Sequence, residues 1–160
     1  MTTNRYLENR GWIDPMTLRI NEHGYRECRY CNQSIIPPKR TFCSKQCVHE
    51  YRLRSSGSYL RQCVYARDLG ICAGCGVDTK FIARQLMDAM DNLDKLNELR
   101  TQYNIHNKRN ITSLKKNGGG LWDADHIIDV QNGGGSCGLE NIRTLCIKCH
   151  KKKTFEKKNI

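Results

Sequence analysis

Long hydrophobic runs are missing from this sequence of 160 residues. No apolar stretch approaches the roughly 20 residues that a membrane-spanning helix needs, so we expect no membrane partner. The first residues, MTTNRYLENR, also lack the apolar segment of a signal peptide. We therefore expect an intracellular protein, in the cytoplasm or nucleus, or encoded by a virus or phage and acting inside the host cell.

Apolar residues are scarce overall, at 38% of the chain, which allows one ordinary domain or two very small ones with a modest core. Ten cysteines can make up for this weak core. Disulfides are rare in a reducing compartment, and cysteine pairs two residues apart favour metal binding. Acidic residues are also few, 16 against 27 Lys and Arg, and this basic balance weakly favours a polyanionic partner.

The first cysteine cluster has the spacing Cys-x2-Cys-x11-Cys-x3-Cys. Four thiolates with these spacings predict a closed, tetrahedral zinc site. Because sulfur fills every position, no water can bind, and we expect this zinc to support structure without catalysing a reaction. The predicted ligands are Cys28, Cys31, Cys43 and Cys47.

The second cluster is split into two Cys-x2-Cys pairs that 70 residues separate. Together the pairs predict one more closed zinc site, which would join the middle of the chain to its C-terminal helix. The predicted ligands are Cys72, Cys75, Cys146 and Cys149. Cys63 and Cys137 remain, and we expect them to be buried or partly buried free thiols.

Helices are predicted before the second cysteine cluster and directly after its first pair of cysteines. Ser44 is placed to cap one helix, and Ser58 to cap another over about residues 59–67 that ends at Gly70. Apolar residues from Ile82 to Leu99 step by three or four positions, which predicts one amphipathic helix. The polar, basic stretch 102–120 predicts a mobile loop.

The C-terminal third mixes short strands with a helix. Residues 121–130 and 142–145 are rich in apolar and β-prone residues and predict two strands. Between them, residues 132–135 read Asn-Gly-Gly-Gly and must turn. A Lys-rich helix is expected from about Lys148.

Four residues in this region have the chemistry of a phosphodiesterase, with the spacing His126-x14-Asn141-x8-His150 and Asp125 directly before His126. Such an enzyme needs a metal cage with open positions, a base and a rigid frame. Asp125 and His150 can supply the cage, and the His126 imidazole can be the base. Asn141 can hydrogen-bond across the turn. Because adjacent strand residues point to opposite faces, Asp125 and His126 reach one cleft only if the strand bends or bulges.

These motifs resemble the HNH endonucleases with the ββα-metal motif, and in particular the zinc-containing nuclease module attached to some eukaryotic annealing helicases. The similar segments are 42–50, 64–76, 122–128, 137–150 and Lys153-Thr154. The resemblance implies that Asp125 and His150 bind a catalytic divalent ion, His126 activates water and Asn141 orients the loop. It also implies 5′-phosphate and 3′-hydroxyl products. Hard phosphate oxygens favour Mg²⁺ or Mn²⁺, and a histidine ligand also admits Ni²⁺ or Zn²⁺.

The resulting prediction is a small α+β protein with a ββα-metal HNH core that a four-cysteine zinc site braces. It has an irregular arm at 1–27, a zinc module at 28–57, and a nuclease domain at 58–160 with a helical insertion at about 81–120. We expect it to cleave DNA phosphodiesters. The residues expected to contact DNA are Lys148, Lys151, Lys152 and Lys153. The alternative interpretation is that these lysines only form a solvated face of the helix.

Three alternatives remain open. The chain can be a non-catalytic zinc-dependent module that binds nucleic acid. It can be a nuclease subunit that a partner protein targets. An RNA substrate is the third alternative, which matched DNA and RNA duplexes would distinguish.

Overall fold

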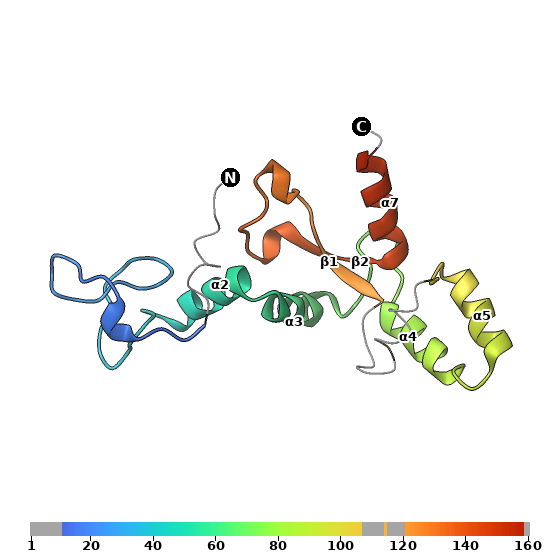
Figure 1. Cartoon of the computed structure of the whole chain (residues 1–160), viewed down its shortest axis with the longest axis horizontal. Coiled ribbons are helices and arrows are strands. Elements are labelled where there is room, and N and C mark those ends of the chain that lie inside the picture. Colours follow the sequence, from blue (N-terminus) through green and yellow to red (C-terminus); the bar gives the residue numbers. More distant parts are fainter. Residues whose placement is uncertain (1–10, 107–113, 115–120, 159–160) are drawn as a thin grey trace. The chain divides into compact units, whose positions relative to one another are not determined.

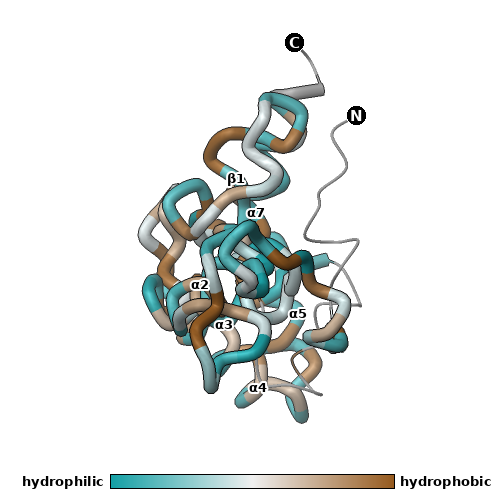
Figure 2. The backbone as a smooth tube through the Cα atoms, turned by 90° about the vertical axis from the view of Figure 1, so that its left-hand side faces the viewer, coloured by the Kyte–Doolittle hydropathy of each residue, from teal (hydrophilic) through white to brown (hydrophobic). Residues whose placement is uncertain are grey.

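The computed structural model describes residues 11–106, 114 and 121–158, and these residues divide into two compact units. The first unit comprises Met1–Cys63 and Ile128–Asn141, and the second comprises Val64–Ile127 and Ile142–Ile160. Helix α3 (Gly57–Asp68) continues from the first unit into the second. Along the described chain, hydrophobic residues come in short stretches (Figure 2), and no described helix is long and apolar enough to cross a membrane.

The first unit is built around a small cysteine-containing core. Its N-terminal part has one short 3-10 helix (Pro15–Thr17) and isolated bridges at Ile20↔Arg26 and Glu27↔Ser34. Helix α2 (Lys45–Ser55) then begins after Ser44, whose side chain accepts a hydrogen bond from the amide of Cys47. The predicted Ser44 cap is therefore confirmed, and it fixes Cys47 in the first turn of the helix.

Helix α3 begins earlier than the sequence suggested. The prediction that Ser58 caps it is wrong, because the helix already includes Gly57 and the hydroxyl of Ser56 accepts from the amide of Tyr59 at 3.4 Å. Its predicted end is confirmed: the helix stops at Asp68, and Gly70 follows with a φ of +82°. Glycine adopts this left-handed conformation without the steric cost of a Cβ atom.

The helical insertion consists of two helices, α4 (Thr79–Asp88) and α5 (Leu93–Gln102), so the prediction of one helix is wrong. The side chain of Asn92 accepts from the amide of Lys95 and starts a new helix where the apolar period alone would continue. The two helices pack around a core that includes Ile82, Leu86, Leu96, Leu99 and Leu114. Most of the loop predicted at 102–120 lies outside the described residues.

Strands β1 (Trp122–His126) and β2 (Ile142–Cys146) form an antiparallel pair, and helix α7 (Ile147–Lys158) packs against both (Figure 1). The second strand and the C-terminal helix are confirmed, whereas the first strand is shorter than the predicted 121–130. Strand β1 ends at His126 because the chain bends at the next two residues. The described residues thus form a small α+β fold of five α-helices and a two-stranded sheet.

The end of α3 is joined to the sheet by Asp68. Its carboxylate accepts hydrogen bonds from the hydroxyl of Thr144 at 2.8 Å and the amide of Thr144 at 3.2 Å. The Arg67 guanidinium beside it, followed by Thr144, holds the pKa of this carboxyl below its usual range. A lowered pKa means that the ionised carboxylate stabilises the fold, and this contribution is present at neutral pH and is lost in acid, as the pH falls below the ordinary value for an aspartate and through the lowered one.

We expect Asp68→Asn to lower the free energy of unfolding by about 2 kcal/mol, the typical worth of a hydrogen bond to a charged group. Urea unfolding at neutral pH in the presence of zinc measures this loss. In a double-mutant cycle, Thr144→Val should cost much less in the Asp68→Asn background than in the unmodified protein. Additive losses would show that the contact between these two side chains does not contribute.

Candidate active site and cysteine clusters

The first cysteine cluster brings Cys28, Cys31, Cys43 and Cys47 together, with their sulfur atoms within 4.8 Å of one another. Burial, followed by the neighbouring thiols, raises the pKa of Cys43 to about 12. For Cys28, burial raises the pKa, but hydrogen bonds from backbone amides outweigh it and lower the value to about 7. Crowded thiols of this kind share a small volume as thiolates only when a cation balances their charge, so this donor set fits zinc.

The second cluster joins Cys72, Cys75, Cys146 and Cys149, again within 4.8 Å. The sulfur of Cys72 accepts from the amide of Cys146 at 3.2 Å and from that of Gly74 at 3.4 Å. Although burial raises the pKa of Cys72, these and another amide lower it to about 7. Amide donors that stabilise a thiolate are the surroundings a zinc-bound sulfur needs.

The turn between Cys72 and Cys75 passes close to α7. A Cβ atom on Gly74 would lie 3.2 Å from the sulfur of Cys149 and 3.4 Å from Leu145. Glycine therefore permits the close approach of the turn to the start of α7. Both cysteine clusters can hold zinc, and the two remaining cysteines, Cys63 and Cys137, are free and partly buried, as the sequence predicted.

Asp125 lies on β1 directly opposite Arg143 on β2 and is only 7% exposed. Its Oδ2 atom accepts from Lys153 Nζ at 2.7 Å and from Arg143 Nε at 3.2 Å. Its Oδ1 atom lies 3.9 Å from Nε2 of His150. Two cations thus hold one carboxylate oxygen, while the other oxygen faces the imidazole of α7.

His150 is held from its other side by Asp123, a residue that the sequence analysis missed. The Nδ1 atom of His150 lies 3.1 Å from Oδ2 of Asp123, so Nε2 is the nitrogen directed to Asp125. A carboxylate that fixes one imidazole nitrogen leaves the other to bind a metal. The signal was in the sequence: Asp123 and Asp125 are two residues apart on one strand and therefore share a face.

Within the described residues, the two cysteine clusters are the groups in which three or more potential metal ligands gather within 4.8 Å. Asp125 and His150 form a smaller set of one oxygen and one nitrogen. A pair of this kind leaves coordination positions for water and substrate, as a catalytic ion requires.

His126 is the last residue of β1 and pairs with Ile142, while Asp125 pairs with Arg143, so the register has no bulge. Alternation therefore directs the side chains of Asp125 and His126 to opposite faces, and the bend comes only after His126. Among the described residues, the imidazole of His126 has no hydrogen-bond partner. The structure does not join this ring to Asp125 or His150 by a direct contact.

Asn141 is 9% exposed and bonds to the loop that follows β1. Its Oδ1 accepts from the amide of Ile128 at 2.7 Å, and its Nδ2 donates to the carbonyl oxygens of Ile128 and Gly134, each at 3.0 Å. A Cβ atom on Gly134 would lie 1.8 Å from the Ile128 oxygen, so this position admits only glycine without a backbone shift. Asn141 and Gly134 thus define the path of the chain two residues after His126.

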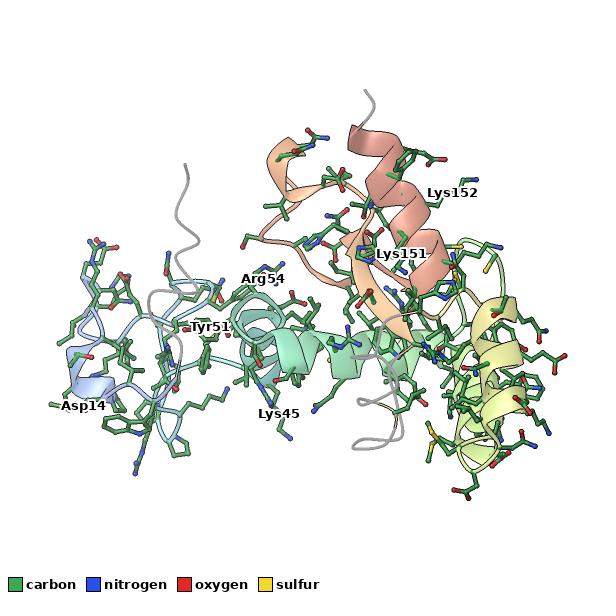
Figure 3. All side chains as sticks on the ribbon, turned by 45° about the vertical axis from the view of Figure 1, so that its right-hand side comes forward. Asp14, Lys45, Tyr51, Arg54, Lys151 and Lys152 are labelled. Atoms are coloured by element: carbon green, nitrogen blue, oxygen red, sulfur yellow. The ribbon has the colours of Figure 1, made fainter. Side chains whose placement is uncertain are left out.

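The four lysines expected to contact DNA differ in their surroundings. Lys153 is 17% exposed, and its Nζ atom donates to Asp125 and to the carbonyl oxygen of His126. The other three, Lys148, Lys151 and Lys152, are exposed on α7 (Figure 3 labels the last two). Lys151 and Lys152 come three and four residues after Lys148 and therefore lie on the same side of the helix as Lys148.

Residues 105–156 match the family model described as HNH endonuclease. The chain is 34% identical over 148 residues to the DNA annealing helicase and endonuclease ZRANB3 of Mus musculus, and 32% identical over 146 residues to that of Homo sapiens. These matches cover 86% and 84% of this chain but 14% of each relative. No solved structure matches the chain.

The family match spans Asp125, His126, Asn141 and His150, and the relatives match most of the chain. These similarities support a nuclease function. The chain therefore carries a domain of the HNH endonuclease family.

Proposed function

We propose that this protein is a metal-dependent DNA endonuclease of the ββα-metal type that uses one catalytic divalent ion and His126 as general base. The observation that carries the proposal is the 3.9 Å approach of Asp125 Oδ1 to His150 Nε2 inside the segment that matches the HNH family. Both atoms are kept available by partners on their other sides, namely Lys153 and Arg143 for Asp125, and Asp123 for His150.

Asp125 and His150 would hold the catalytic ion. A carboxylate oxygen suits Mg²⁺ or Mn²⁺, and an imidazole also admits Ni²⁺ or Zn²⁺. When bound, such an ion supplies Lewis-acid stabilisation of charge on the phosphate and the leaving oxygen. The two cysteine clusters would hold structural zinc and take no part in the reaction, because sulfur fills their four positions.

The remaining groups would orient the reacting atoms. His126 is the last residue of β1, directly before the bend, and its ring would have to turn toward the Asp125 face to take a proton from the attacking water as the new phosphorus–oxygen bond forms. The bond from phosphorus to the 3′ oxygen breaks, which leaves a 5′-phosphate and a 3′-hydroxyl. Asn141 would act as a positioning residue, because it holds the backbone at Ile128, two residues after the base.

DNA is the proposed substrate, and the exposed lysines 148, 151 and 152 would add affinity that does not depend on base sequence. Lys153 would support Asp125, its observed partner. The relatives are named as annealing helicases as well as endonucleases, and this chain spans 14% of their length. The small share of the relatives' length therefore favours a second candidate function, a nuclease subunit that a partner protein targets to DNA.

The test is cleavage of supercoiled plasmid with added Mg²⁺ or Mn²⁺ by the unmodified protein and by His126→Ala with its zinc retained. We expect metal-dependent conversion to open-circle or linear DNA by the unmodified protein and loss of conversion in the variant. The variant is a better control than a chelator, which would also strip zinc from the cysteines.

Two results would contradict the proposal. Equal cleavage by both folded proteins would remove His126 from the role of base. If neither protein cuts DNA with any divalent ion while both bind it, the isolated chain is a binding module or depends on a partner.

A further inference from the structure

We infer that Arg143 binds a phosphate of the DNA strand at this site, an inference that rests on the proposed nuclease function. Arg143 lies on β2 directly opposite Asp125 on β1. In an antiparallel pair, residues that lie directly opposite each other project from the same face of the sheet. The guanidinium is therefore on the face that carries Asp125 and that His150 approaches from α7.

The contact between Arg143 and Asp125 uses one donor of the guanidinium. Its Nε atom donates to Asp125 Oδ2 at 3.2 Å. Among the described residues, neither terminal nitrogen of Arg143 has a hydrogen-bond partner. A guanidinium carries five N–H donors, so four stay available. They form a planar fork whose geometry matches two oxygens of a phosphate.

The position of Arg143 also suits an anion that arrives from solvent. Its side chain is 35% exposed, against 17% for Lys153 and 8% for Asp125. Lys153 already donates to the same carboxylate oxygen at the shorter distance of 2.7 Å. Because the ammonium of Lys153 balances the charge of Asp125, the charge of Arg143 is left to attract a phosphate.

Other cations of the same unit are less suited to this task. The guanidinium of Arg67 is engaged by the carboxylate of Asp68 and by the carbonyl oxygen of Ile142 at 2.7 Å. Lys153 is mostly buried against Asp125 and the backbone of His126. Lys151 and Lys152 are exposed one and two positions after His150 along α7, and the ammonium of Lys152 lies 3.8 Å from the carboxylate of Glu156.

The two functions of Arg143 would be compatible. Its Nε would keep Asp125 oriented, while its terminal nitrogens bind the two non-bridging oxygens of a phosphodiester. Charge on these oxygens increases as water adds to phosphorus, so the same hydrogen bonds would become stronger in the transition state. Arg143 would then contribute to DNA affinity and to the rate of cleavage.

The test measures DNA binding without cleavage, in the His126→Ala background and at a series of salt concentrations. A phosphate contact contributes about 0.9 to the slope of log K against log salt concentration. We expect Arg143→Gln to reduce the slope by about this amount and to weaken binding at low salt. Arg84→Gln on α4 is the matched control, because it removes the same charge from an exposed site in the same unit.

Kinetics with the otherwise unmodified protein provide the second measurement. Arg143→Gln should raise KM and lower kcat, while Arg143→Lys should recover the salt slope but only part of kcat, because an ammonium lacks the planar fork. Thermal unfolding and zinc content establish that each variant is folded.

An arginine that only supports Asp125 would give a different result. Arg143→Gln would then lower the melting temperature or the affinity for Mn²⁺, but its salt slope would equal that of the Arg84→Gln control, and the inference would be wrong. Because binding is measured in a cleavage-inactive background, equal slopes overturn it even if the chain never cuts DNA. If the unmodified protein does not cleave the plasmid, that result contradicts the proposed function and leaves the inference about Arg143 to the binding measurement.

Discussion

Cys146→Ser is expected to release one of two bound zinc ions per chain and to unfold the unit made of Val64–Ile127 and Ile142–Ile160. Cys146 is 8% exposed and belongs to a cluster whose two halves come from distant segments. Structural zinc contributes about 10–16 kcal/mol to the folding of zinc-finger peptides. This is as large as the whole stability of a typical domain, which is about 5–15 kcal/mol, so the loss should be close to complete.

The measurement is zinc per chain by elemental analysis, together with amide hydrogen exchange of the second unit. Cys63→Ser is the matched control, because Cys63 is partly buried and lies outside both clusters. It should retain both zinc ions and the protection of its amides. A Cys146→Ser protein that still binds two zinc ions, or a control that loses one, would contradict the assignment of ligands.

Asp125→Asn should reduce the rate of DNA cleavage about a thousandfold or more. The substitution removes the charge that would bind the catalytic ion, whose stabilisation of the transition state is worth several kcal/mol, and each 1.36 kcal/mol is a factor of ten in rate. Stability should fall as well, by about 2 kcal/mol, the typical worth of a hydrogen bond to a charged group, because Lys153 is left as a mostly buried cation without its carboxylate.

A second substitution separates these two effects. In Asp125→Asn/Lys153→Met, the mostly buried ammonium that lost its carboxylate is gone, so urea unfolding should show that much of the lost stability returns. Cleavage should not return, and the affinity for Mn²⁺, measured by calorimetry, should stay low. If the double variant recovers cleavage together with stability, Asp125 has a structural role and is not a ligand of the catalytic ion.

Local patterns were sufficient for much of the fold. The cap at Ser44, the end of α3 before Gly70 and the second strand were predicted correctly, since each depends on a few neighbouring residues. The first strand was predicted in the right place but too long. The division of the insertion into two helices was not predicted, because a regular apolar period continues through the break between α4 and α5. There Asn92 could be a helical residue or a cap, and packing of the two helices around a shared core selects the cap.

The candidate site was predictable as a set of residues but not as an arrangement. The motif indicated Asp125, His126, Asn141 and His150, while it did not indicate that Asp123 holds His150 or that Lys153 and Arg143 hold Asp125. Lys153 was grouped with exposed lysines because sequence spacing alone does not show which side of a helix packs against a sheet. Contacts between α7 and β1 depend on register and on where the helix begins.

The sequence by itself determined the chemistry that is present and how it is grouped. Cysteine pairs at short spacings predicted the two sets of four sulfurs, because two cysteines at either end of a tight turn can bind the same metal ion. Tertiary structure alone decided which nitrogen of His150 and which oxygen of Asp125 face each other, and which donors of Arg143 are unused. These features depend on side chains from β1, β2 and α7 meeting at distances of a few ångströms, and no local pattern encodes such distances.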